Sequence, residues 1–322
     1  MPALRDRRRL KGYGLALLAA ACWATGGLTA KWLFTTASSE NAGWPIPPLG
    51  IALEPTALSG GRALSAFLIL LAYLAVTRRD ALRVSVRELP FFAVFGILGM
   101  AGVHYTYFKT ISLTNVATAI LLEYLAPVLV LVVSVVFLKH KLTWTLPLGV
   151  ALSVTGCALV VGAIGGQGMV VSPAGVAWGL ASAVFFATYS LMGSWAATRF
   201  SPFKTLVFGL GFASVFWLAV LGPASVLGVF GEAQTAFAVL FVAVVSTIIP
   251  FTAFLAALRY IAPTNATVTS TVEPVIAGIG AFALFGEALT PLQLIGGALV
   301  VAAIAVVQLP ERNPAPMLPP QD

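Results

Sequence analysis

The chain has 322 residues, of which 59% are hydrophobic and only 9% charged, and its mean hydropathy is +0.98. Soluble domains are about a quarter charged, so this composition indicates an integral membrane protein. The net charge of +7 lies in short connections between apolar runs, which argues against a nucleic-acid-binding surface. Cys22 and Cys157 both fall inside apolar runs, where a packing role is expected rather than a disulfide framework or a metal site.

Sequence motifs of the common enzyme classes are absent. The sequence contains no P-loop signature, no His-Glu-x-x-His, no Cys-x-x-Cys and no Gly-x-Ser-x-Gly. With only two histidines, neither a metal centre nor a catalytic triad is expected. We therefore expect a protein that is not an enzyme and binds no cofactor.

Ten apolar runs follow a basic N-terminal segment, and each is long enough to cross a hydrocarbon core of about 30 Å. Backbone groups cannot stay unpaired in lipid, so we expect an all-α integral membrane fold with ten transmembrane helices. The first run is too long for the apolar part of a signal peptide and is expected to be retained. The predicted spans are 12–35, 55–77, 89–110, 114–138, 144–163, 172–197, 203–225, 234–258, 264–285 and 290–308.

The basic residues predict an orientation for these spans. Of the 18 Lys and Arg residues, 15 lie on the predicted inner side, only Lys31 and Lys109 lie toward the outer ends of their spans, and Arg62 lies within a span. Cytoplasmic loops carry an excess of Lys and Arg, so both termini are predicted to be cytoplasmic.

The second half of the chain repeats the first. Residues 109–115 and 259–265 both read basic-x-Ile-x-x-Thr-Asn, and Pro127 corresponds to Pro274. A repeat with an odd number of spans must insert its second copy upside down, which predicts two inverted five-helix repeats. Asn115 and Asn265 stand at equivalent span starts and are expected to cap them. The predicted segments are a basic cytoplasmic tail (1–11), the first repeat (12–163), a Gly-rich outer linker (164–171), the second repeat (172–308) and a Pro-rich cytoplasmic tail (309–322).

The stretch from Val272 to Gly296 carries the most specific pattern, Glu-Pro followed by Phe-Gly-Glu-x-Leu-Thr and a later Gly. With five spans per half, it resembles the drug/metabolite transporter superfamily, and within it the EamA-like ten-helix, two-repeat family. The first repeat departs from the pattern, because His140 stands where the second has Glu. The resemblance implies an inner-membrane carrier of small metabolites, often an exporter of amino acids or related compounds.

Two acids are predicted near the bilayer midplane, Glu123 and Glu273. Each precedes a proline, Pro127 and Pro274, which kinks a helix and frees a carbonyl one turn back. A charge at this depth must face a polar cavity, be paired or be protonated. Glu123 could bind a substrate amine or exchange it for a proton; the alternative is a neutral, hydrogen-bonded acid. For Glu273, satisfying freed backbone N–H groups is the favoured role.

The candidate binding residues also include Tyr124, which follows Glu123, and four further side chains with an aromatic or imidazole ring. His104 and Tyr107 share a helix face and could line a cavity, although their outer position favours an interfacial aromatic belt. Trp23 and Tyr189 lie at comparable depths in the two halves and could stack on a flat or cationic solute, with packing the alternative. Arg62 could attract a carboxylate, but such side chains more often snorkel to the interface.

The sequence thus predicts a secondary carrier that moves small polar or amphipathic metabolites through a central cavity by alternating access. The substrate-binding residues are expected to be Glu123, Tyr124, His104, Tyr107, Trp23, Tyr189 and Glu273, with Pro127 and Pro274 as gating kinks. The expected partners are the solute, membrane lipids and a proton as a candidate coupling ion, with no nucleic acid; the oligomeric state is left open. The alternative is a carrier or flippase for a lipid-linked headgroup. A membrane enzyme and a non-transporting receptor are less favoured.

Overall fold

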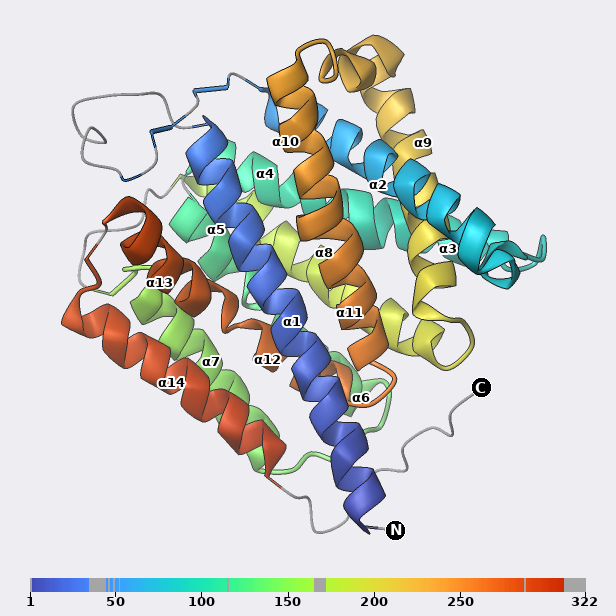
Figure 1. The fold of residues 1–322 in the computed structure, drawn as a ribbon. Coiled ribbons are helices and arrows are strands. Elements are labelled where there is room, and N and C mark those ends of the chain that lie inside the picture. Colours follow the sequence, from blue (N-terminus) through green and yellow to red (C-terminus); the bar gives the residue numbers. More distant parts are fainter. Residues whose placement is uncertain are drawn as a thin grey trace.

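The computed structural model describes residues 2–34, 45, 47–48, 50–51, 53–114, 116–164, 172–286 and 288–309, and this part of the chain is helical without a strand (Figure 1). The elements are α1 (Pro2–Phe34), α2 (Pro55–Thr77), η2 (Arg79–Leu82), α3 (Leu89–Val94), η3 (Phe95–Gly102), α4 (Val103–Leu113), α5 (Val116–Glu123), α6 (Ala126–Val136), α7 (Thr145–Val160), α8 (Pro173–Ala197), α9 (Pro202–Gly228), α10 (Ala233–Ala243), η4 (Val244–Ile248), α11 (Ile249–Ala257), α12 (Pro263–Ser270), α13 (Glu273–Phe285) and α14 (Pro291–Gln308).

Eight helices of the described chain are long and apolar enough to cross a membrane, and they correspond to eight of the predicted spans. The two other predicted spans correspond to α1 and to α7, an apolar helix of 16 residues. The basic segment 1–11 is helical from Pro2 onward, because Arg, Lys and Leu are good helix formers and continue α1 beyond the apolar run. The outer segment before α2, the linker 164–171 and the tail 309–322 lie largely outside the described residues.

Four spans are irregular, and they occupy equivalent places in the two halves. The span at 114–138 consists of α5 and α6, and the span at 264–285 consists of α12 and α13, each pair separated by a two-residue turn. The spans before them contain the π-helical turns η3 and η4. A π-helical turn widens the helix and often marks a functional site.

The helices pack in a pattern that is unchanged when the two halves are exchanged. In the first half α1 packs against α11, α12 and α13, and in the second half α8 packs against α4 and η3, and against α5 and α6. Likewise α2 packs against α9, and α7 lies along α14, as Figure 1 shows at the lower left. The contacts of a two-fold interface have this reciprocity, in which each contact is matched by its counterpart.

The α7–α14 contact shows the same reciprocity at the level of single residues. A Cβ on Gly156 would lie 2.7 Å from the carbonyl oxygen of Gly296, and one on Gly149 would lie 3.5 Å from the carbonyl oxygen of Ala303. The repeat offset of 147 residues relates the two contacts: Gly149 corresponds to Gly296, and Ala303 corresponds to Gly156. These glycines let the two backbones touch, which is how helices associate tightly in lipid.

Asn265 does not cap α12 as predicted, because Ala262 occupies the N-cap position. Its side-chain amide instead donates to the Tyr13 hydroxyl at 2.7 Å and to the Val307 carbonyl at 3.0 Å, and Tyr13 donates to the same carbonyl at 2.8 Å. Pro263 has no N–H to satisfy and already starts the helix, so the amide is free to join α1, α12 and α14. Asn115 lies outside the described residues.

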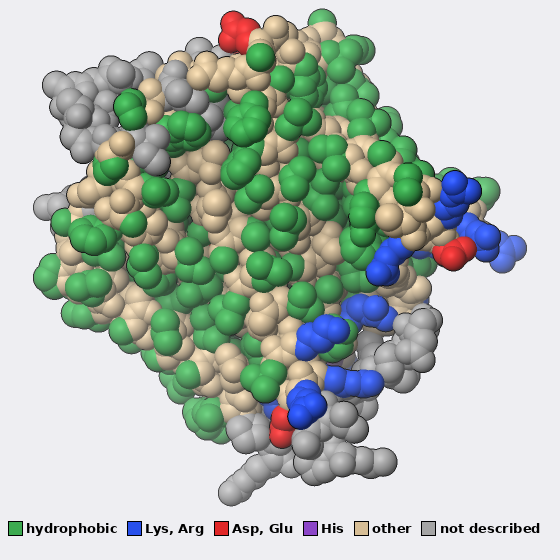
Figure 2. Space-filling model, viewed as in Figure 1, with side chains coloured by type: hydrophobic (Ala, Val, Ile, Leu, Met, Phe, Trp, Pro, Cys, Tyr) green, Lys and Arg blue, Asp and Glu red, His purple; other side chains and the backbone are tan. Residues whose placement is uncertain are grey.

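Basic side chains gather at one end of the molecule. Figure 2 shows Lys and Arg at the lower right, toward the end where α1 begins in Figure 1, while apolar side chains cover much of the rest of the visible face. At the start of α9, Lys204 forms an ion pair of 2.8 Å with Glu88, next to α3. The hydrogen bond from Lys204, together with one from the Ser85 backbone, lowers the pKa of the Glu88 carboxyl.

Two neighbouring glycines of α14 provide a matched test of the close helix contact. A Cβ on Gly296 would meet backbone atoms of α7 at 2.7 to 2.8 Å, whereas one on Gly297 would make an ordinary contact of 3.4 Å with Val275. We expect Gly296→Ala to lower the free energy of unfolding in detergent by about 1–3 kcal/mol, as overpacking does. Gly297→Ala should be neutral or stabilising by up to about 1 kcal/mol. Equal losses in both variants would show that α7 and α14 are not in close contact.

The Glu88–Lys204 pair predicts a pH-dependent stability. A lowered carboxyl pKa in the folded state favours folding above the unfolded value of about 4.3, and this contribution disappears as the pH falls through the folded value. Glu88→Gln should therefore lower the free energy of unfolding by about 1 kcal/mol or less at pH 7, with no difference left below the folded pKa. Asp80→Asn, in a fully exposed pair with Arg83, is the control and should have no effect. A Glu88→Gln effect that did not vary with pH would contradict the assignment.

Candidate functional site

Glu123 is the last residue of α5 and stands at the break of its span. Its carboxylate accepts a hydrogen bond from the hydroxyl of Ser182 in α8, which belongs to the other half of the chain. Pro127, four residues later, has no N–H and so cannot bond the Glu123 carbonyl in the α-helical manner. The residue therefore presents both a carboxylate and a backbone acceptor where the helix is interrupted.

Tyr124 joins the two interrupted spans. Its hydroxyl lies 3.0 Å from the carbonyl oxygen of Ser270, at the end of α12, and also within hydrogen-bonding distance of the Glu273 carboxylate. The Ser270 carbonyl is the one that Pro274 deprives of its helical donor, so Tyr124 replaces the missing backbone N–H. A phenol carries one proton, so both contacts are fully satisfied only when Glu273 is protonated and donates to Tyr124.

The contacts of Glu273 therefore differ from those expected from the sequence. Its hydrogen-bond partner among the described residues is the Tyr124 hydroxyl rather than a freed backbone N–H. Its place at the first turn of α13 is favourable for an acid, because the N-terminal end of a helix dipole is positive. The residue thus connects the two halves of the chain instead of only closing its own helix.

Tyr107 and Arg62 extend this polar group from α4 and α2. Tyr107 lies within electrostatic reach of Arg62, Glu123 and Glu273, and its hydroxyl makes no hydrogen bond to any described residue. Arg62 is buried, and its Nη2 is hydrogen-bonded to Nε2 of the equally buried His104. The structure thus brings together four predicted residues, Glu123, Tyr124, Tyr107 and Glu273, with His104 reached through Arg62.

Trp23 and Tyr189 lie in an aromatic cluster instead. Trp23 packs edge-on against Phe251 at 5.4 Å between ring centroids, and Tyr189 packs against the same ring at 5.3 Å. Tyr189 is fully buried, which gives it a packing role, whereas Trp23 is partly exposed. The Phe251 ring also contacts His104 at 5.5 Å, so this cluster borders the polar group.

Arg62 and Ser182 were absent from the predicted site. An arginine inside an apolar span was the available signal for Arg62, because such residues are rare in membranes and mark functional positions. Ser182 had no signal, since a serine hydroxyl in a membrane helix usually bonds its own backbone. No group of three His, Cys, Asp or Glu side chains that could hold a metal occurs among the described residues.

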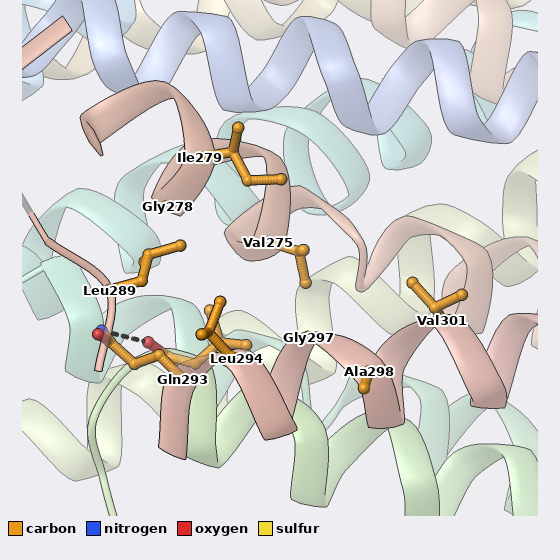
Figure 3. Close-up of a pocket in the computed structure, with 10 residues that line it drawn as sticks. Val275, Gly278, Ile279, Leu289, Gln293, Leu294, Gly297, Ala298 and Val301 are labelled. Carbon is orange, nitrogen blue, oxygen red and sulfur yellow. Dashed lines mark hydrogen bonds between the residues drawn. The ribbon is translucent and has the colours of Figure 1, made fainter. Parts of the chain in front are cut away.

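A pocket of about 370 Å³ lies apart from this polar group, between α13 and α14 (Figure 3). Its lining is apolar except for Gln293, and none of the predicted site residues belongs to it. The Gln293 side chain is already satisfied, because it donates to the Val160 carbonyl and accepts from the Thr290 N–H. The pocket therefore suits an apolar chain better than a polar solute.

A membrane-spanning helical fold in which two interrupted helices meet at partly buried acids is typical of membrane transporters. The profile of the EamA-like transporter family matches residues 10–162 and 173–309, and the chain belongs to this family. The match covers both predicted halves and confirms the resemblance seen in the sequence.

Curated relatives agree with this membership. An uncharacterised transporter of Archaeoglobus fulgidus is 32% identical over 73% of this chain and 81% of its own. A "Probable terminal-alkyne amino-acid exporter" of Streptantibioticus cattleyicolor is 28% identical over 69% and 73% of the two chains, and the uncharacterised inner membrane transporter YicL of Salmonella typhimurium is 23% identical over 95% and 97%. A crystal structure 22% identical to this chain shares its fold, with a TM-score of 0.71 over 92% and 96% of the two chains. The chain is a multi-pass transporter of the inner membrane.

The contact of Tyr124 with the freed carbonyl can be tested by a double-mutant cycle. Tyr124→Phe should lower the free energy of unfolding by about 1–3 kcal/mol, because it leaves the Ser270 carbonyl and Glu273 without their partner. Pro274→Ala supplies a backbone N–H to that carbonyl, so the Tyr124→Phe cost should be smaller in this background. Tyr73→Phe, at an exposed tyrosine, is the control and should cost little. An unchanged Tyr124→Phe cost in the Pro274→Ala background would overturn the assignment.

Proposed function

We propose that this protein is a ten-helix, inverted-repeat secondary transporter that exports amino acids or closely related small metabolites. The observation that carries the proposal is the meeting of the two interrupted spans, where Tyr124 bonds the Ser270 carbonyl and Glu273 close to the partly buried acid Glu123. Interrupted helices in corresponding places of two repeats are where transporters bind their solutes. The amino-acid class is supported by the name of the Streptantibioticus relative.

The reciprocal helix packing supports the inverted repeat. Each first helix packs against the third and fourth spans of the other half, and α2–α9 and α7–α14 pair like with like. The gathering of Lys and Arg at the end where α1 begins supports cytoplasmic termini, because cytoplasmic loops are rich in basic residues. Alternating access is then the rocking of one half against the other around a central site.

The site residues have separate roles in this mechanism. Glu123 binds the solute amine or, alternately, a proton, and Ser182 holds the carboxylate in place when the site is empty. Tyr124 and Glu273 form a contact between the halves that must break or shift when the halves move. The turns before Pro127 and Pro274 supply the interrupted backbone about which α6 and α13 can tilt.

The alternative function is a carrier or flippase for a lipid-linked headgroup. The apolar pocket between α13 and α14 favours it, because that pocket could hold an acyl chain. A flippase would move lipid-linked substrates but no free amino acid.

The proposal is tested by uptake of labelled amino acids and amines into proteoliposomes, with and without an imposed pH gradient. We expect gradient-dependent movement by the wild-type protein and its loss in Glu123→Gln, because an amide can neither balance an amine nor release a proton. Glu88→Gln, which removes a carboxyl outside the site, should retain transport. Full activity of Glu123→Gln would refute the assigned role, and no movement by folded wild-type protein would favour the lipid-linked alternative.

A further inference from the structure

Arg62 is a buried cation without an ionic partner. Only 8% of the residue is exposed, and no carboxylate of the described chain lies within ion-pair distance of it. Among the described residues its only hydrogen-bond partner is His104, and its Nε has none. A guanidinium carries five N–H donors, so most of its hydrogen-bonding capacity is unused. An uncompensated buried charge is strongly destabilising, which makes this arrangement costly unless an anion visits it.

His104 adds a second unused donor. A guanidinium can only donate, so Nε2 of His104 must accept the bond from Arg62 and carry no proton. The neutral imidazole then carries its proton on Nδ1, and no residue in the described part of the chain is hydrogen-bonded to this buried Nδ1. Two adjacent side chains, from α2 and α4, therefore hold N–H groups for which no described residue supplies an acceptor.

The position of this donor pair relates it to the acids. Arg62 lies within electrostatic reach of Glu123, yet the Glu123 carboxylate is hydrogen-bonded to Ser182 and forms no ion pair with Arg62. Tyr107, whose hydroxyl has no described partner, is within electrostatic reach of both. An unpaired cation and an acid in one polar group offer the two charges that a zwitterionic solute would need.

We propose that Arg62 binds the carboxylate of the solute while Glu123 binds its amine, so that the site selects zwitterions of the α-amino acid type. This inference rests on the proposed function. Arg62 and a carboxylate match in geometry, because the guanidinium fork donates two parallel hydrogen bonds to the two oxygens. His104 is a positioning residue, since its bond to Nη2 fixes the orientation of the fork.

The wild-type protein tests the substrate class without any substitution. The twenty labelled L-amino acids are compared in proteoliposomes with the corresponding amino-acid amides and decarboxylated amines, which keep the amine but lack the carboxylate. We expect the best amino acid to have a KM lower by roughly 30-fold or more than its amide and amine, because the Arg62 charge is then left unpaired. Equal KM values would overturn the inference while leaving the proposed transporter intact. Movement of none of these solutes would instead refute the proposed function.

Variants of Arg62 test whether this residue causes the preference for a solute carboxylate. Arg62→Gln should raise the KM for the amino acid to about that of its amide, with the KM for the amide unchanged or lower. Arg62→Lys keeps the charge without the fork and should give an intermediate KM. Arg199→Gln, at an exposed cation stacked on Trp195, is the control and should leave every KM unchanged. An Arg62→Gln variant that weakened transport of the amino acid and its amide equally would show a structural role and overturn the inference. If this variant fails to fold, Arg62→Lys and the wild-type comparison decide the question.

Discussion

The fold depends on how the protein satisfies backbone groups that its prolines leave unpaired inside the membrane. Pro274 removes the helical donor of the Ser270 carbonyl, and in lipid no water replaces it. The Tyr124 hydroxyl supplies the missing donor from the other half of the chain. Tyr124, at the break between α5 and α6, therefore stabilises the break between α12 and α13. This hydrogen bond joins the two halves at the points where their helices are interrupted.

Much of this organisation follows from the sequence. Apolar length and basic loops predict a multi-pass helical protein, and the acid–proline pairs at Glu123 and Glu273 predict where the spans are interrupted, because proline has the same backbone chemistry everywhere. The structure breaks both spans at these places. The match at offsets near 150 also predicts two related halves, and reciprocal contacts such as Gly156–Gly296 agree with it.

Other features depend on tertiary contacts that have no local signal. The π-helical turns η3 and η4 lie in apolar sequence like that of the neighbouring helices. A hydropathy pattern therefore does not distinguish them from regular α-helix. The bond between Arg62 and His104 joins residues 42 positions apart, and the serine that holds Glu123 lies 59 positions away. Asn265 illustrates the same limit, because a residue placed like a cap instead joins three helices.

The Tyr124 hydrogen bonds between the halves have no equivalent made by the second half, although the helix packing is reciprocal. Tyr124 has no tyrosine counterpart in the second half, where the positions 147 and 150 residues later are Thr271 and Pro274. Two identical halves related by a two-fold axis in the membrane plane would give inward-open and outward-open forms of equal energy. In the alternating-access mechanism proposed above, a bond made by only one half would remove this degeneracy and give the empty protein a preferred resting side even across a membrane without any gradient. In the transport cycle proposed above, the protein itself would then bias the direction of net transport kinetically, while the gradients would still set its thermodynamic limit.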